Sequence, residues 1–154
     1  MLRFVFLLAA ALLLAAAVHA HQFTVGELVI NHPWARPTAS GMPTGAAYLS
    51  ITNHGEHDDV LMGAHSPAAT RVEFHRTSFE SGMARMRPAG VLVIEAGNTL
   101  AATPGGLHLM LVDLNTPLLK GESVPLVLTF KNAGEITVQM KIESHDGAAT
   151  GATH

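Results

Sequence analysis

Residues 124–142 read VPLVLTF, then KNAG, then EITVQMKI, and this stretch decides the fold class. In the last segment, apolar side chains at every second position from 136 to 142 alternate with polar ones. Such a period of two is typical of a β-strand with one buried face. The KNAG segment at 131–134 has the composition of a turn. We therefore expect two strands joined by a turn, with Met140 in the core.

Short segments of the same kind extend outward from this stretch. We expect further strands at residues 23–30, 46–52, 59–65 and 71–79, and a short strand around Met86. The segment 32–37 carries two prolines, so it is not expected to continue a regular ladder. No segment shows sustained helical periodicity. The sequence therefore predicts a single all-β domain, built as a sandwich or barrel.

The two ends of the chain differ in composition from this domain. Residues 1–20 have a basic start, an apolar run and small residues before Ala20, which predicts a signal peptide cleaved near Ala20. The run is short for a membrane span of about 20 residues, and cleavage after Ala17 or retention as an anchor is the less favoured alternative. Residues 21–143 are the predicted domain. Residues 144–154 are rich in Gly, Ala and Thr, which predicts a flexible tail.

Charge and cysteine content exclude several classes of partner and site. The net charge is −3 with histidine neutral, which argues against nucleic acid or an anionic membrane surface as partner. The chain has no cysteine. A blue-copper electron-transfer centre and a CxxC copper site both need cysteine, so neither fits.

Candidate metal ligands appear in the segment 104–111, PGGLHLML. His108 and Met110 are two residues apart and alternate with three leucines. Side chains two apart on a strand leave the same face about 6–7 Å apart, so both can reach one small ion. The leucines are then expected to face the core. His75 is placed in the same way on the polar side of its strand, opposite in phase to Phe74.

The thioether of methionine is a soft donor, and its presence among the candidate ligands limits which metal ions fit. A thioether with imidazole favours Cu(I), whereas Zn(II) prefers thiolate, imidazole or carboxylate. A single methionine is more often a core residue, and a single histidine more often a surface residue. It is the joint spacing of His75, Met86, His108 and Met110 that favours a metal site. Met83, three residues before Met86, is the first alternative if Met86 is not a ligand.

The spacing His75-x10-Met86-x21-His108-x-Met110 resembles the copper-binding signature of the periplasmic copper chaperones of the PCuAC family. Further segments that carry the resemblance are ARPT at 35–38, AAYL at 46–49, SPAA at 66–69, MRP at 86–88 and PGGLHLM at 104–110. The resemblance implies a periplasmic protein with a cupredoxin-like Greek-key β-barrel or sandwich that carries Cu(I) on the four named residues. It also implies delivery of copper to the CuA site in subunit II of cytochrome c oxidase, alongside a Sco-type protein.

A second copper, as Cu(II), is a further possibility. Some relatives in the PCuAC family carry a longer His- and Met-rich tail for such an ion, whereas this tail has only His145 and His154 and no methionine. His21 would follow the predicted cleavage site and could chelate Cu(II), although a frayed terminus is the simpler interpretation.

Three other functions compete with a copper chaperone. A copper-buffering or resistance protein would bind the same ion with the same residues. An oxygenase would use His21 in a His-brace. A metal-free adhesion module would use none of them. No phosphate loop, nucleophile elbow or paired carboxylate occurs at a telling spacing, so we expect no enzymatic activity.

Overall fold

The computed structural model describes residues 21–145, and within them the regular elements are all β-strands, joined by turns and loops. The strands are β1 (Gln22–Val25), β2 (Leu28–Ala35), β3 (Thr44–Asn53), β4 (Asp59–His65), β5 (Ala69–Glu80), β6 (Met83–Pro88), β7 (Leu92–Ile94), β8 (Thr99–Ala102), β9 (Leu107–Leu114), β10 (Ser123–Phe130) and β11 (Gly134–Ile142). The predicted all-β class is confirmed. A helix long and apolar enough to cross a membrane does not occur in this part of the chain. The predicted signal peptide and residues 146–154 of the predicted tail lie outside it.

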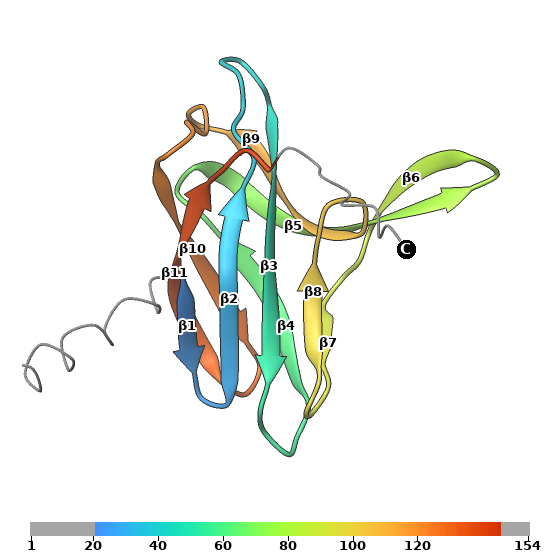
Figure 1. Cartoon of the computed structure of the whole chain (residues 1–154), viewed down its shortest axis with the longest axis vertical. Coiled ribbons are helices and arrows are strands. Elements are labelled where there is room, and N and C mark those ends of the chain that lie inside the picture. Colours follow the sequence, from blue (N-terminus) through green and yellow to red (C-terminus); the bar gives the residue numbers. More distant parts are fainter. Residues whose placement is uncertain (1–20, 146–154) are drawn as a thin grey trace, which may run out of the picture.

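All eleven strands belong to one sheet that folds around a single core (Figure 1). The hydrogen-bonded order is β6-β5-β9-β3-β2-β11-β10-β4-β7, with β1 added beside β2 and β8 beside β3. The path leaves β6 at one end and β7 at the other, so the barrel is not closed. Most neighbours in this order are distant in sequence, and the topology therefore decides which residues meet.

The pair β10 and β11 forms as the alternation predicts. The strands are antiparallel from Ser123 opposite Lys141 to Phe130 opposite Gly134. Leu126, Leu128 and Met140 are each fully buried. Burial of a side chain of this size stabilises a fold by roughly 1.5–3 kcal/mol, so this hairpin supplies a large part of the core.

The predicted first strand, 23–30, is in fact a hairpin. Gly26 has a positive φ of 55° and turns the chain between β1 and β2. Val25 lies opposite Leu28, and Gln22 lies opposite Asn31. A glycine adopts this backbone conformation without a steric cost, and for this reason a run of strand-forming residues divides here.

The ladder is irregular at residues 32 and 33, as expected for the segment 32–37, but the strand itself does not end there. Strand β2 continues through Pro33 to Ala35, because the ladder with β3 shifts register between Asn31 and Trp34. A proline has no N–H to donate, and it is tolerated in a strand where a bulge interrupts pairing. Within this bulge His32 has a positive φ of 44°.

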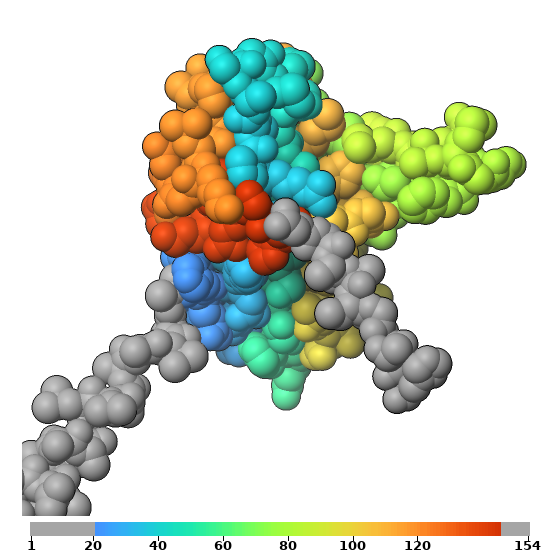
Figure 2. Space-filling view, turned by 45° about the horizontal axis from the view of Figure 1, so that its top comes forward, coloured from blue at the N-terminus to red at the C-terminus, as the bar shows by residue number. Residues whose placement is uncertain are grey.

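Strands β5, β6 and β9 form the part of the sheet that holds the predicted ligands. Strand β5 pairs with β6 on one side and with β9 on the other. The outer part of the β5–β6 hairpin projects from the body of the molecule, as the yellow-green segment in Figure 2 shows. The base of the hairpin, which carries His75, remains paired with β9.

Candidate metal centre

His75 and His108 occupy directly opposite positions of the antiparallel ladder between β5 and β9. Their imidazole centroids are 6.0 Å apart. The neighbouring opposite pair, Phe74 and Leu109, is buried in the core. Since successive side chains on a strand point to opposite faces, both histidines lie on the other face of the sheet.

Met110 lies on the same face as the two histidines. It is two residues after His108 on β9 and lies opposite Glu73, which is two residues before His75 on β5. Diagonal neighbours of this kind have Cα atoms about 7–8 Å apart, within reach of long side chains. Leu107, Leu109 and Leu111 are buried, so the predicted alternation along β9 is confirmed.

Met86 joins this face from the third strand. It lies opposite Thr77 in the β5–β6 ladder, and Thr77 is two residues after His75. Directly opposite residues share a face, so Met86 and His75 do as well. Met86 is nevertheless 54% exposed and stands one strand farther from β9 than His75 does. The structure therefore places His75, His108 and Met110 on two adjacent strands, and Met86 on the outermost strand beside them.

The alternative donor Met83 has a less suitable position. It lies opposite Glu80 near the tip of the hairpin. It comes three positions before Met86, so on this regular strand the two methionines point to opposite faces. Met83 is 57% exposed. The register thus favours Met86 over Met83.

His108 is buried and has one nitrogen already engaged. Its Nδ1 lies 3.0 Å from the carbonyl oxygen of Gly106, to which an Nδ1–H donates. This contact sets the tautomer in which Nε2 carries a free lone pair. A metal-binding histidine commonly has its second nitrogen held by a carbonyl or carboxylate, and His108 fits that pattern.

His75 is held by a carboxylate that the sequence reasoning missed. Its Nε2–H donates to Oε2 of Glu73 at 2.8 Å, while Arg71 Nε donates to Oε1 of the same carboxylate at 2.7 Å. The hydrogen bond from Arg71, followed by that from His75, lowers the pKa of Glu73 below its usual value. Glu73 is therefore ionised at neutral pH and fixes the His75 ring. Its position two residues before His75 was the available signal.

The remaining nitrogen of His75 has no partner. Among the described residues, His75 Nδ1 is the one buried side-chain nitrogen or oxygen without a hydrogen bond. A buried polar atom left unpaired is destabilising by about 1–3 kcal/mol. A lone pair left free on the sheet face that also carries His108 and Met110 suits a soft cation, which would satisfy it.

Other candidate donors are distributed elsewhere. His54 and His57 are exposed in the loop between β3 and β4, and Met42 and Met62 are each 50% exposed outside the β5–β6–β9 segment. None of these four residues belongs to strand β5, β6 or β9. His21 and His145 both lie close to His32, and His154 lies outside the described residues.

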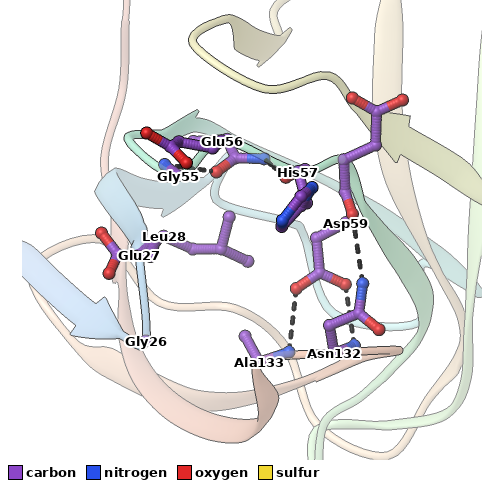
Figure 3. Close-up of a pocket in the computed structure, with 11 residues that line it drawn as sticks. Gly26, Glu27, Leu28, Gly55, Glu56, His57, Asp59, Asn132 and Ala133 are labelled. Carbon is purple, nitrogen blue, oxygen red and sulfur yellow. Dashed lines mark hydrogen bonds between the residues drawn. The ribbon is translucent and has the colours of Figure 1, made fainter.

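A hollow of about 500 Å³ lies at the ends of other strands and involves none of the predicted ligands (Figure 3). The turns β1–β2 and β10–β11 and the β3–β4 loop line it. Its buried carboxylate, Asp59, accepts hydrogen bonds from the backbone N–H groups of Val60, Asn132 and Ala133 at 2.7–2.9 Å. Asp59 is thus satisfied by the turns it holds together, which is a structural role.

Residues 28–142 match the family model described as "Putative lipoprotein LpqE-like". The chain belongs to this family. It is 32% identical over 120 residues to "Putative lipoprotein Lxx21020" of Leifsonia xyli subsp. xyli, a match that covers 77% of this chain and 71% of the relative.

Solved structures of PCuAC domains share the fold. A copper-bound PCuAC domain from PmoF2 superposes with a TM-score of 0.71 at 26% identity, covering 81% of this chain and 99% of that domain. The solution structure of CuI-DR1885 from Deinococcus radiodurans gives a TM-score of 0.62 at 28% identity, covering 86% and 87%. The resemblance to PCuAC proteins and the cupredoxin-like fold are therefore confirmed. The comparisons do not bear on the four-residue motif, which stays a prediction.

Proposed function

We propose that this protein is an exported Cu(I) carrier whose ion binds to His75, Met86, His108 and Met110. The observation that supports this most directly is the buried, unpartnered Nδ1 of His75, which lies on the residue opposite His108. A neutral imidazole lone pair of this kind is a donor in need of an acceptor. The similar solved structures of a copper-bound PCuAC domain from PmoF2 and of CuI-DR1885 support the choice of ion.

The donor set suits a protein that hands its ion on. All four ligands are neutral, so Cu(I) keeps its single positive charge and no ligand proton is released. Met86 is exposed on the projecting hairpin, and an incoming donor can replace its thioether first. Release then proceeds by stepwise ligand exchange, which requires no catalysis. A thioether also forms no disulfide in an oxidising compartment, although it can be oxidised to a sulfoxide.

The recipient in this proposal is the CuA site of cytochrome c oxidase subunit II, with a Sco-type protein as a second partner in the periplasm. The PCuAC resemblance and the signal-like residues 1–20 support this part of the proposal. Passive buffering uses the same site and differs only in whether the ion is transferred.

Transfer is the measurement that separates a carrier from a buffer. Protein loaded with one equivalent of Cu(I) is mixed anaerobically with the apo CuA domain of an oxidase, and the copper in each protein is measured after separation. We expect copper to move to the CuA domain, and to move faster from the Met86→Leu variant because the ion then has one protein ligand fewer to exchange. Copper that remains on this protein would favour buffering, and an inability to load Cu(I) would refute the carrier itself.

A further inference from the structure

A second group of metal-binding side chains lies away from strands β5, β6 and β9. His32, Glu143 and His145 place one ligand atom each within 4.8 Å of one another. His32 Nε2 and His145 Nε2 both lie 2.9 Å from the same oxygen, Oε2 of Glu143. Two imidazole nitrogens and one carboxylate oxygen therefore converge on a single point. Among the described residues, no other three histidine, aspartate or glutamate side chains converge in this way.

The topology assembles this group from opposite ends of the domain. Strand β11 runs parallel to the end of β2, with Lys141 opposite Trp34 and Ile142 opposite Ala35. The N–H of Glu143 then donates to the carbonyl of Ala35 at 3.0 Å, which fixes the carboxylate beside β2. The two chain segments lie side by side in Figure 1, where red meets blue.

The bulge in β2 aims His32 at this carboxylate. The register shift between Asn31 and Trp34 and the positive φ of 44° at His32 both depart from a regular strand. Bulges are frequent next to functional sites because they redirect a side chain. Here the redirected side chain is a histidine that is half exposed, so its ring is accessible to an ion from solvent.

Two more rings complete the surroundings. The carbonyl of His21 accepts a hydrogen bond from the N–H of His32 at 2.9 Å, and the rings of His21 and His32 lie 6.1 Å apart. This places a further imidazole within reach as a fourth ligand. The ring of Trp34 lies 4.1 Å from that of His145 and 6.4 Å from that of His32.

We propose that His32, Glu143 and His145 bind one divalent transition-metal ion, Cu(II) in preference to Zn(II), with His21 as the candidate fourth ligand. Imidazole and carboxylate suit divalent ions, and a given nitrogen and oxygen site binds Cu(II) more tightly than Zn(II). On binding, each Nε2 gives its lone pair to the ion, and the ring proton relocates to Nδ1 through water. This site shares no residue with the proposed Cu(I) site and does not depend on it.

Trp34 provides a local reporter because it is the single tryptophan of the chain. Bound Cu(II) is paramagnetic and quenches the fluorescence of an adjacent indole, whereas diamagnetic Zn(II) does so far less. Untagged protein produced from the full-length sequence is titrated with Cu(II), and fluorescence is recorded together with the electron paramagnetic resonance spectrum. We expect saturable quenching by one equivalent, a spectrum with nitrogen ligands, and no displacement by an equal concentration of Zn(II).

Three single variants test the ligands. Glu143→Gln and His145→Gln keep the size of exposed or half-buried side chains, and His32→Asn places at the positive φ a residue that tolerates it. Each should lower Cu(II) affinity at least about tenfold and remove the quenching. The matched control is His54→Gln, in the exposed β3–β4 loop, which should change neither. Circular dichroism establishes that each variant is folded.

Two results would overturn the proposal. One is Cu(II) affinity and quenching that persist in both Glu143→Gln and His145→Gln. The other is loss of binding only in His21→Gln or only in His154→Gln, which would assign the ion to a terminus. Cu(I) titration of Glu143→Gln should give wild-type affinity, and the double variant His108→Gln, Met110→Leu should retain Cu(II) quenching. Failure of one site is thereby distinguished from failure of the other.

Discussion

Glu73 holds His75 through a 2.8 Å hydrogen bond to Nε2, and this contact leaves Nδ1 of the same ring buried without a partner. The carboxylate is itself fixed by Arg71, which also donates to Asp113 at 3.0 Å. The apo protein thus keeps one His75 nitrogen oriented and the other free. This arrangement resembles the carboxylate–histidine–metal arrangement of known metal sites.

Glu73 should therefore contribute to copper affinity without binding the ion. In Glu73→Ala the His75 ring loses its orienting acceptor, and we expect Cu(I) affinity to fall by about ten- to a hundredfold. The control is Glu80→Ala on the same strand, which removes a carboxylate paired with Arg85 and Arg87 on the exposed hairpin. Competition titration against a Cu(I) chelator measures both. Equal affinity in the two variants would show that Glu73 has no such role.

The two methionines of β6 should differ in their effect. Met86 shares a face with His75 and Met83 does not, so Met86→Leu should weaken Cu(I) binding whereas Met83→Leu should leave it unchanged. Leucine preserves volume and apolar character at both exposed positions, which keeps the comparison free of folding effects. X-ray absorption should show one sulfur fewer in the copper shell of Met86→Leu only. The reverse result would exchange the two assignments.

Asp59 should matter for stability and not for copper. Its carboxylate accepts three backbone hydrogen bonds and is 5% exposed. Asp59→Ala leaves these N–H groups without a charged acceptor, and we expect the free energy of unfolding to fall by about 2–4 kcal/mol. The exposed Glu56→Ala, in the loop that precedes β4, should change it by less than about 0.5 kcal/mol. Urea denaturation measures both, and a change in Cu(I) affinity of folded Asp59→Ala would contradict the separation of the two regions.

Local alternation carried enough information to predict much of the fold. The alternation of apolar and polar residues and the KNAG turn predicted strands β10 and β11. The alternating leucines predicted on which face of its strand His108 lies. The β1–β2 turn was missed because Gly26 interrupts an otherwise continuous run of strand-forming residues. The two prolines correctly indicated an irregular ladder at this point. That β2 resumes its pairing after Pro33 was missed, because a bulge depends on the partner strand, which local sequence does not identify.

The two proposed metal sites also differ in whether local sequence could reveal them. The spacing of His75, Met86, His108 and Met110 could be interpreted because it resembles a known pattern. The pair His32 and Glu143 is separated by 111 residues and shares no local pattern. Only the parallel pairing of β11 with β2 brings these two side chains together, and topology of this kind was beyond the reach of sequence reasoning.

The central claim is that His75, Met86, His108 and Met110 form one Cu(I) site, and an anaerobic Cu(I) titration with X-ray absorption at the copper edge tests it most directly. The wild-type protein should bind one equivalent tightly in a mixed shell of nitrogen and sulfur. The double variant His108→Gln, Met110→Leu should stay folded and lose tight binding. A copper shell without sulfur, or unchanged Cu(I) affinity in the double variant, would contradict the claim.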